Sequence, residues 1–479
     1  MNQYLFLMRF LLNPQAMKNV KLMVEPVVKD EENNPLFGED KPWEVRIDNG
    51  YPNVIYDPQE KLYRCFYTLF IEDMDCFGVP REERASRDYV PRADRVTGLA
   101  YAQSRDGIHW EKPELNRVSW HGNTNNNLLF KYAHGTGVML DLHETDPKRR
   151  YKMVTKMDFP EKENHMAVSY SPDGIHWEDP IPWPKYNPQA DSHNLPVWSE
   201  KENCYLLFSR IWRDGIRITT ISRSKDFLNW SKPEECIRGQ GFENQIYAMP
   251  VFTWGDYYLG LASMFHEGER DAEDFDLVDL ELTYGVNSSK FDFAAFGQHV
   301  IPRGKGKYPD GEYDCGCIYA SPPVITPDGE MWIYYMGGNG RHTNFRETSL
   351  ARARWYPDKF AALLSRDPEK ESCIATNWMR VTGDRLELLA DCAEGQKDAF
   401  LEVQAAPSWN KPAFEGFDYG DSCVAREGDR LYISFENGHK LSELAGQRMV
   451  FKIRFKGYKL WAVKGDLEIA DHRLWEGSV

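Results

Sequence analysis

The protein has 479 residues, of which 42% are hydrophobic and 28% are charged, a balance that is ordinary for a globular protein. Its 74 acidic residues outnumber its 58 Lys and Arg residues, and the net charge of −16 argues against nucleic acid or an anionic membrane as a partner. The chain has no run of 18 apolar residues, so we expect no membrane-spanning helix.

The cysteines and the N-terminus indicate a cytoplasmic protein. Nine Cys residues are scattered along the chain, only Cys315 and Cys317 lie close together, and no second pair lies at zinc-binding spacing. An odd set of scattered thiols is typical of a reducing compartment. The apolar stretch 5–12 is short, is interrupted by Arg9 and lacks a small-residue cleavage site, so we expect no signal peptide.

In chain order, a lead-in over residues 1–47 precedes a pattern that is β throughout. Alternating apolar and polar residues bounded by turn residues predict five units of three or four strands, with a charged loop over residues 72–95. The predicted strands are 53–56, 62–68 and 98–103; 137–142, 150–157 and 165–170; 195–198, 204–210 and 216–222; 247–253, 257–264 and 277–287; 317–325, 331–336 and 348–355. Plain strands without this repeat follow at 385–389, 400–403, 431–435, 449–455 and 458–463.

A seven-residue motif follows the last strand of each of the first three units. It is Ser-Arg-Asp-Gly-Ile-His-Trp at 104–110, Ser-Pro-Asp-Gly-Ile-His-Trp at 171–177 and Ser-Lys-Asp-Phe-Leu-Asn-Trp at 224–230. The Trp residues are 67 and 53 residues apart, a spacing that is typical of repeat architectures. Asp and Gly favour a tight turn, which the apolar residue and the Trp would pin onto the sheet, so we interpret the motif as structural.

Units of this kind bury their faces when they are arranged radially. We therefore predict an all-β protein, with a five-bladed β-propeller followed by a small C-terminal β-sandwich, and place the domain boundary between residues 375 and 376. An array of β-sandwiches is the alternative interpretation.

Acidic residues stand just before the first strand of four units, where loops of a propeller converge on its axis. They are Asp48, Asp191, Glu243 and Asp314, and in the second unit the nearest acid is Asp141, inside the strand. A protonated and an ionised carboxyl group together are what cleavage of a glycosidic bond requires. The structural alternative is that each acid caps a loop amide or pairs with an Arg.

Neutral or cationic hydrogen-bonding residues accompany these acids and are candidates for holding sugar hydroxyls. They are Asn49, His193, Asn194, Asn244, Arg341 and His342, the last two on the flexible, Gly-rich stretch 337–342. That stretch lacks the spacing and the Lys of a phosphate-binding loop, and the chain has no Gly-x-Ser-x-Gly element for a nucleophilic serine.

The repeated Ser-x-Asp-Gly-Ile-x-Trp turn resembles the five-bladed propeller glycosidases of glycoside hydrolase families 32 and 43 and related bacterial proteins. The segments Asp-Ser-His-Asn at 191–194 and Glu-Tyr-Asp-Cys-Gly-Cys-Ile-Tyr at 312–319 also resemble them. The resemblance implies an Asp at the start of blade one, a tuning Asp in blade two and a Glu acid in blade three. Asp48 matches the first by position, whereas blade three carries Asp191 and the Glu comes one blade later, at Glu243.

Our first hypothesis is a glycoside hydrolase that acts on a terminal sugar, with furanosides among the candidate substrates. Asp48 would be the nucleophile or base, Glu243 or Asp191 the acid, and Asp314 a substrate-binding or pKa-tuning carboxylate. We expect a small carbohydrate partner and no cofactor, and a Ca²⁺ ion bound by the same acids stays open.

Two other functions stay open. A glycoside phosphorylase would use Arg341 and His342 with Arg213 or Arg217 for phosphate. A non-catalytic carbohydrate-binding propeller would keep its acids in salt bridges. The sequence does not address the sugar, the linkage or the oligomeric state.

Overall fold

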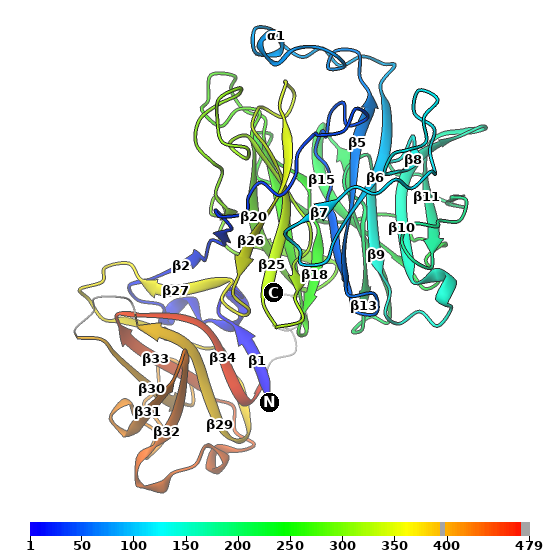
Figure 1. The fold of residues 1–479 in the computed structure, drawn as a ribbon. Coiled ribbons are helices and arrows are strands. Elements are labelled where there is room, and N and C mark those ends of the chain that lie inside the picture. The colour runs from blue at the N-terminus through cyan, green and yellow to red at the C-terminus, as the bar shows by residue number, and fades with distance from the viewer. Residues whose placement is uncertain (393–397, 471–479) are drawn as a thin grey trace. The chain divides into compact units, whose positions relative to one another are not determined.

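The computed structural model of the protein describes residues 1–392 and 398–470, and it confirms the all-β class (Figure 1). In these residues the one α-helix is α1 (Arg81–Ala85), inside the predicted charged loop, and no helix is long and apolar enough to cross a membrane. The described 3-10 helices are Arg9–Leu11, Pro14–Ala16, Pro147–Arg149, Tyr419–Asp421, Glu436–Gly438 and Leu441–Leu444.

The chain folds into two compact units. The larger unit consists of Pro26–Asp292 and His299–Trp355, and the smaller unit contains Met1–Glu25, Phe293–Gln298 and the chain from Tyr356 onward. Residues 1–25 and 356–375, which we predicted to belong with the propeller, therefore pack in the smaller unit.

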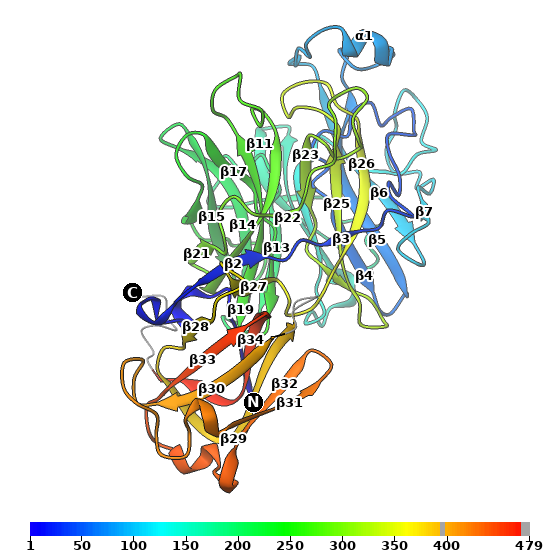
Figure 2. The same ribbon diagram turned by 90° about the vertical axis from the view of Figure 1, so that its left-hand side faces the viewer.

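Strand pairing is the physical reason for this assignment. The N-terminal strand β1 pairs with β34, and β2 pairs with β27, so that the first residues complete a sheet built from the end of the chain (Figure 2). That sheet has the order β2-β27-β34-β29-β32-β31, and a second sheet has the order β28-β33-β30. The strands are β1 (Asn2–Leu5), β2 (Val20–Val24), β27 (Ala361–Ser365), β28 (Ser372–Ala375), β29 (Met379–Cys392), β30 (Phe400–Ala406), β31 (Ser422–Glu427), β32 (Arg430–Phe435), β33 (Val450–Lys456) and β34 (Tyr458–Ile469).

In the larger unit, each of the first three predicted repeats forms an antiparallel sheet whose strands follow chain order. β8 (Leu128–Lys131) adds to the first sheet beside β6. The three sheets are β4 (Asn53–Asp57), β5 (Leu62–Glu72), β6 (Val96–Ser104) and β7 (Trp110–Glu111); β9 (His134–Leu140), β10 (Tyr151–Phe159), β11 (Lys162–Ser171) and β12 (Ile181–Pro182); β13 (Leu195–Ser199), β14 (Cys204–Arg213), β15 (Ile216–Ser224) and β16 (Glu234–Arg238).

The fourth and fifth repeats share one 11-stranded sheet, in which a single parallel bridge between Val278 and Cys317 joins the two halves. The predicted strands 247–253 and 317–325 are each interrupted, at Met249–Pro250 and at Pro322–Pro323, because Pro lacks the amide that a ladder needs. The strands are β17 (Asn244–Ala248), β18 (Val251–Trp254), β19 (Tyr257–His266), β20 (Val278–Asn287), β21 (Lys290–Phe293), β22 (His299–Ile301), β23 (Cys317–Ala320), β24 (Val324–Ile325), β25 (Met331–Gly338), β26 (Thr348–Trp355) and β3 (Val28–Lys29).

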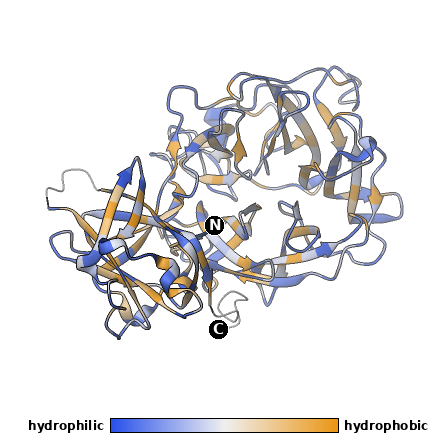
Figure 3. Cartoon of the chain, turned by 90° about the horizontal axis from the view of Figure 1, so that it is seen from below, coloured by the Kyte–Doolittle hydropathy of each residue, from blue (hydrophilic) through white to orange (hydrophobic). Residues whose placement is uncertain are grey.

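The first strands of the repeats contact one another. β4 contacts β9, β9 contacts β13, β13 contacts β18, β19 and β20 contact β23, and β24 contacts β4 again. Hydrophobic residues, orange in Figure 3, lie mainly on strands, whereas the connecting loops are mostly hydrophilic. The segments that precede the first strands therefore approach one another at one end of the larger unit.

The repeated motif forms the expected turn. In the first copy the Ser104 hydroxyl accepts a hydrogen bond from the Gly107 amide (2.9 Å), and Asp106 Oδ1 accepts from the Ile108 and His109 amides (2.8 Å each). The Asp residues of the other two copies accept the corresponding pair of amide bonds. The closing Trp packs in a hydrophobic core in each case, so the motif is structural.

The third copy of the motif has Phe227 at the position where the other two copies have glycine. Gly107 and Gly174 have φ angles of 73° and 75°, and Phe227 takes the same left-handed conformation with φ of 66°. A non-Gly residue is strained there. Phe227 is fully buried, with its ring centroid 5.1 Å from that of Tyr205 and 5.4 Å from that of Trp230, and this packing offsets the strain.

The Gly107→Ala variant tests how closely the turn is packed. The added Cβ would lie 2.2 Å from the Tyr334 hydroxyl and would require positive φ, so we expect the free energy of unfolding to fall by about 2–4 kcal/mol. The control is Gly215→Ala, where φ is 78° but nothing lies within 4 Å, and backbone strain of about 1–2 kcal/mol is expected alone. Urea denaturation measures both, and equal losses would contradict this account of the turn.

Candidate active site

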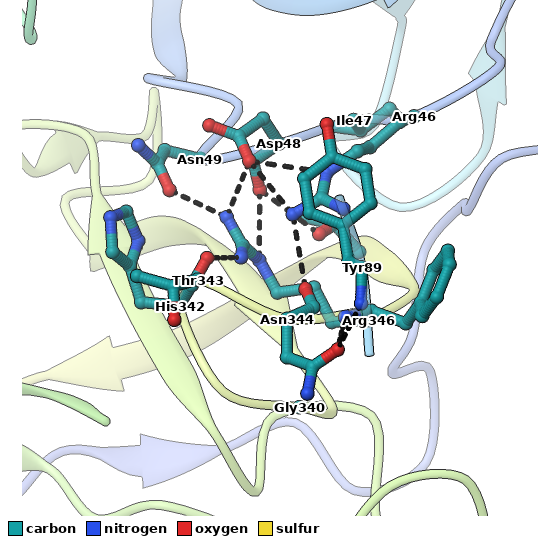
Figure 4. A network of polar contacts seen from close by, with 12 residues as sticks. Arg46, Ile47, Asp48, Asn49, Tyr89, Gly340, His342, Thr343, Asn344 and Arg346 are labelled. Atoms are coloured by element: carbon teal, nitrogen blue, oxygen red, sulfur yellow. Dashed lines mark hydrogen bonds and ion pairs between the residues drawn. The ribbon is translucent and has the colours of Figure 1, made fainter. Parts of the chain in front are cut away.

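Asp48 lies just before β4, where two arginines hold its carboxylate. Its Oδ1 accepts a hydrogen bond from Arg346 Nη2 (2.8 Å) and another from Arg46 Nε (3.2 Å), and its side chain remains 22% exposed (Figure 4). Burial alone would raise the pKa of Asp48, but Arg346 and Arg46 lower it well below its usual range. The carboxylate is therefore ionised at neutral pH.

Arg346 is fully buried and uses its guanidinium to join two distant segments. Its Nε donates to the Asp48 carbonyl (3.3 Å), its Nη1 donates to the carbonyls of Arg341 and His342, and its Nη2 also donates to Asn49 Oδ1 (2.7 Å). Each nitrogen has an acceptor, as a buried cation requires. Asn49 in turn donates to the Tyr51 hydroxyl (2.8 Å).

The Gly-rich stretch at the end of β25 and just after it makes room for this arginine. A Cβ on Gly338 would lie 2.9 Å from Arg346 Cδ, and a Cβ on Gly340 would lie 2.4 Å from the Phe345 carbonyl oxygen. A Cβ on Gly337 would lie 2.5 Å from Asp314 Cβ. These glycines therefore permit close packing, which differs from the flexible loop that we expected from the sequence.

His134 occupies the position in the second repeat where we looked for an acid. It begins β9, and its buried Nδ1 has no hydrogen-bond partner in the described residues. Burial lowers the pKa of His134, and the charges of Asp191 and Asp48 both act against that shift, so the ring lies in the field of both carboxylates. Asp191 is 49% exposed and pairs with Arg210 (2.6 Å).

His193 and Asn194 support the backbone around this site. His193 Nε2 contacts Asn53 Oδ1 (2.9 Å), and burial lowers the pKa of His193 to about 3. Asn194 donates to the carbonyls of Gly135, Ala190 and Ser192 (2.9 Å each). Both side chains are buried and act within the protein.

Aromatic residues from the last two repeats surround His342. The Tyr319 hydroxyl lies 3.1 Å from His342 Nδ1, and the ring centroids of Tyr247 and His342 are 4.5 Å apart. Burial and the charge of Arg346 lower the pKa of His342 well below its ordinary value, so the ring is neutral. Arg210 and Arg217 lie 5.0 Å and 5.2 Å from the Tyr247 ring centroid.

Glu243 and Asn244 stand at the start of the fourth repeat. The Glu243 side chain is exposed and forms no ion pair within the described residues, while its carbonyl accepts from the Glu267 amide (2.8 Å). Asn244 Oδ1 contacts His266 Nδ1 (2.9 Å). Glu267, which sequence reasoning missed, pairs with Arg217 (3.1 Å).

Trp212 was also missed by sequence reasoning. It lies near the end of β14, is 41% exposed, and its ring centroid is 4.3 Å from the Arg217 guanidinium and 5.4 Å from that of Arg210. Its place in the sequence, just after the buried run 204–210 of the same strand, is the signal that could have pointed to it.

Two of the candidate acids are buried and bonded to residues outside the cluster around Asp48. Asp314 is buried, accepting from Lys29 Nζ (2.6 Å) and the Tyr335 hydroxyl (2.9 Å). Asp141 follows the opposite end of β9 from His134, where it pairs with Lys152 (3.0 Å) and accepts from Tyr205 (2.6 Å).

Arg341 is exposed, 5.5 Å from the Phe275 ring centroid. Within residues 1–392 and 398–470, no group of three or more His, Cys, Asp or Glu side chains is placed to hold a metal ion.

No protein-family model matches the chain, and no curated protein matches its sequence. Similar solved structures include an N-acetylgalactosamine deacetylase from F. plautii in complex with blood group B trisaccharide, a glycosyl hydrolase from Bacteroides ovatus and an α-L-arabinofuranosidase from Podospora anserina in complex with cellotriose. They are 14%, 14% and 13% identical to this chain, with TM-scores of 0.42, 0.46 and 0.44. The alignments cover 70%, 69% and 68% of this chain and 96%, 93% and 96% of those chains. Glycoside hydrolases are thus among the solved structures to which this chain is similar.

The charge balance at Asp48 makes stability depend on pH. Because the folded-state pKa lies below the unfolded value of about 3.9, the stabilisation is present above that pH and is lost as the pH falls through the folded pKa. We expect Asp48→Asn to lower the free energy of unfolding at pH 7 by about 3 kcal/mol, because two buried cations lose their anion. The same variant should lose less stability than wild type on acidification.

Urea denaturation at pH 7 and pH 3 measures this difference. Asp256→Asn, at an exposed turn, is the control and should change stability by less than about 0.5 kcal/mol. An Asp48→Asn variant with wild-type stability at pH 7 would contradict the proposed role of the ion pairs.

Proposed function

We propose that the larger unit is a five-bladed β-propeller and that the smaller unit is a β-sandwich. The contacts from β4 through β9, β13, β18 and the 11-stranded sheet back to β4 support a radial arrangement of five blades. Two blades would share the 11-stranded sheet, since only one residue pair bridges its halves. Two separate sheets in the smaller unit support a sandwich.

We further propose that the protein is a glycoside hydrolase acting on a terminal sugar at the ends of the first strands. The observation that carries this proposal is Asp48, a carboxylate that two arginines keep ionised while one edge of it stays exposed. Such a group suits a nucleophile, or an anion that stabilises an oxocarbenium-like transition state. A general acid must be a second carboxyl group.

Glu243 is the better candidate for the acid. It is exposed and forms no ion pair in the described residues, so a substrate can reach its carboxyl group, whereas Asp191 is held by Arg210. Asp191 then helps to orient His134 and the substrate. Trp212 offers an apolar face on which a sugar ring can stack.

Asp314 and Asp141 have no part in this chemistry. Each is buried and contacts a Lys and a Tyr, which supports a structural role for both. The salt bridges of Asp48 and Asp191 favour one second candidate function, a non-catalytic carbohydrate-binding protein.

A hydrolysis assay tests the proposal. Wild type is screened against aryl pyranosides, aryl furanosides and oligosaccharides, with and without phosphate, and we expect one sugar to be released without phosphate. Glu243→Gln and Asp48→Asn should each lower kcat by a factor of about 100 or more, because each removes a group that acts on the reacting atoms.

The matched control is Asp314→Asn, which also removes a buried, ion-paired carboxylate but lies in the Lys29 network. Its activity per folded molecule should match wild type. Full activity of both Glu243→Gln and Asp48→Asn would contradict the assignment of these residues as acid and nucleophile. Binding of a sugar without hydrolysis would favour the carbohydrate-binding function.

A further inference from the structure

A basic cleft opens beside the candidate active site. It has a volume of about 720 Å³ and is lined by parts of three segments, residues 84–88, 303–308 and 339–345. Two acidic residues, Asp88 and Glu273, line it together with six cationic residues: Arg84, Arg87, Arg303, Lys305, Lys307 and Arg341. This positive lining contrasts with the net charge of −16 of the whole chain.

Three of these cations already have ion-pair or hydrogen-bond partners within the protein. Arg87 pairs with Asp75 (2.8 Å), Arg303 pairs with Asp279 (2.7 Å), and Arg84 donates to the backbone carbonyls of Cys76 (2.6 Å) and Val79 (3.0 Å). Because an Asp or backbone carbonyls already bind these side chains, we assign them a structural role in the wall of the cleft.

The other three cations, Lys305, Lys307 and Arg341, form no salt bridge in the part of the chain that the structure describes. The Arg341 guanidinium lies 5.5 Å from the Phe275 ring centroid, and its charge acts against the burial that raises the pKa of Asp276. Cations gathered in one cleft repel one another unless an anion enters. The fork of an Arg side chain binds a carboxylate, sulfate or phosphate with two hydrogen bonds, and Lys adds charge.

The loop that carries both lysines is held in place. The Glu312 amide donates to the Lys305 carbonyl (2.8 Å), the Lys305 amide donates to Glu312 Oε2 (2.9 Å), and the Gly311 amide donates to the Lys307 carbonyl (2.8 Å). Gly306 has a φ of 90°, and a Cβ there would lie 2.7 Å from Gly311 Cα. The lysines are therefore presented by a pinned turn, which lowers the entropy lost on binding.

Arg341 links the cleft to the active site. The next residue, His342, contacts Tyr319 and Tyr247, and the Arg341 carbonyl accepts from Arg346, which holds Asp48. A sugar bound at Asp48 and a group bound at Arg341 would therefore belong to neighbouring parts of one ligand.

We propose that this cleft binds an oxyanion carried by the substrate, so that the protein acts on an acidic glycan bearing a carboxylate or sulfate group. The inference rests on the proposed function for the rest of the ligand, but anion binding can be measured without turnover. Lys305, Lys307 and Arg341 are its binding residues.

Calorimetry of the protein at low ionic strength tests the inference. The probes are digalacturonate, its neutral digalactose counterpart and inorganic phosphate. We expect wild type to bind digalacturonate at least about 10-fold more tightly than digalactose, and this preference should shrink as NaCl is raised to about 500 mM, because salt screens the attraction. The Lys305→Gln/Lys307→Gln/Arg341→Gln variant should lose the preference and keep its affinity for digalactose.

A matched control replaces Lys148 and Lys162, two exposed lysines of the second repeat, with Gln and should leave both affinities unchanged. Equal affinity of wild type for the acidic and neutral sugars would overturn the inference, even if a neutral glycoside is hydrolysed. Tighter binding of inorganic phosphate than of digalacturonate, with turnover that requires phosphate, would also overturn it. Tight digalacturonate binding without hydrolysis would support the cleft and contradict the proposed hydrolase.

Discussion

The buried contact between Arg346 and Asp48 is the interaction on which the rest of the site depends. It joins residues 298 positions apart in sequence, and it links the segment before β4 to the loop before β26. Burying a guanidinium is costly unless its donors are satisfied, and here Asp48, Asn49 and two carbonyls of the loop accept from it. The same contact therefore fixes the position of the loop and the ionised state of the candidate nucleophile.

The charge pattern around this contact follows one physical rule, that a carboxylate removed from water must gain a cation or hydrogen-bond donors. Asp48, Asp191 and Glu267 each pair with an Arg, and the pKa of Asp48 lies well below its usual range, while burial lowers the pKa values of His134 and His342. The site thus holds fixed negative charges beside neutral rings. Positive charge that is left without an acid lies in the neighbouring cleft. The anionic group of an acidic sugar would complement the positive cleft.

Much of the fold could be predicted from local sequence patterns. The alternating strands of the larger unit and the Ser-x-Asp-Gly turns depend on nearby residues, so they could be predicted, as could the place of Asp48 and Asp191 before first strands. Partners from distant parts of the chain could not: no pattern connects Asp314 with Lys29, or β1 with β34. His134 was missed for another reason: we expected an acid before the first strand of the second repeat, and the chain has a histidine there.

A crystal structure of the Glu243→Gln variant with a bound oligosaccharide tests the central claim most directly. If the first-strand ends form the catalytic site, the anomeric carbon should lie about 3–3.5 Å from the Asp48 carboxylate, the distance of a near-attack geometry. The side-chain amide that the substitution introduces should face the glycosidic oxygen. A sugar bound away from Asp48, with the Asp48 and Arg346 contact covered by protein, would contradict the account.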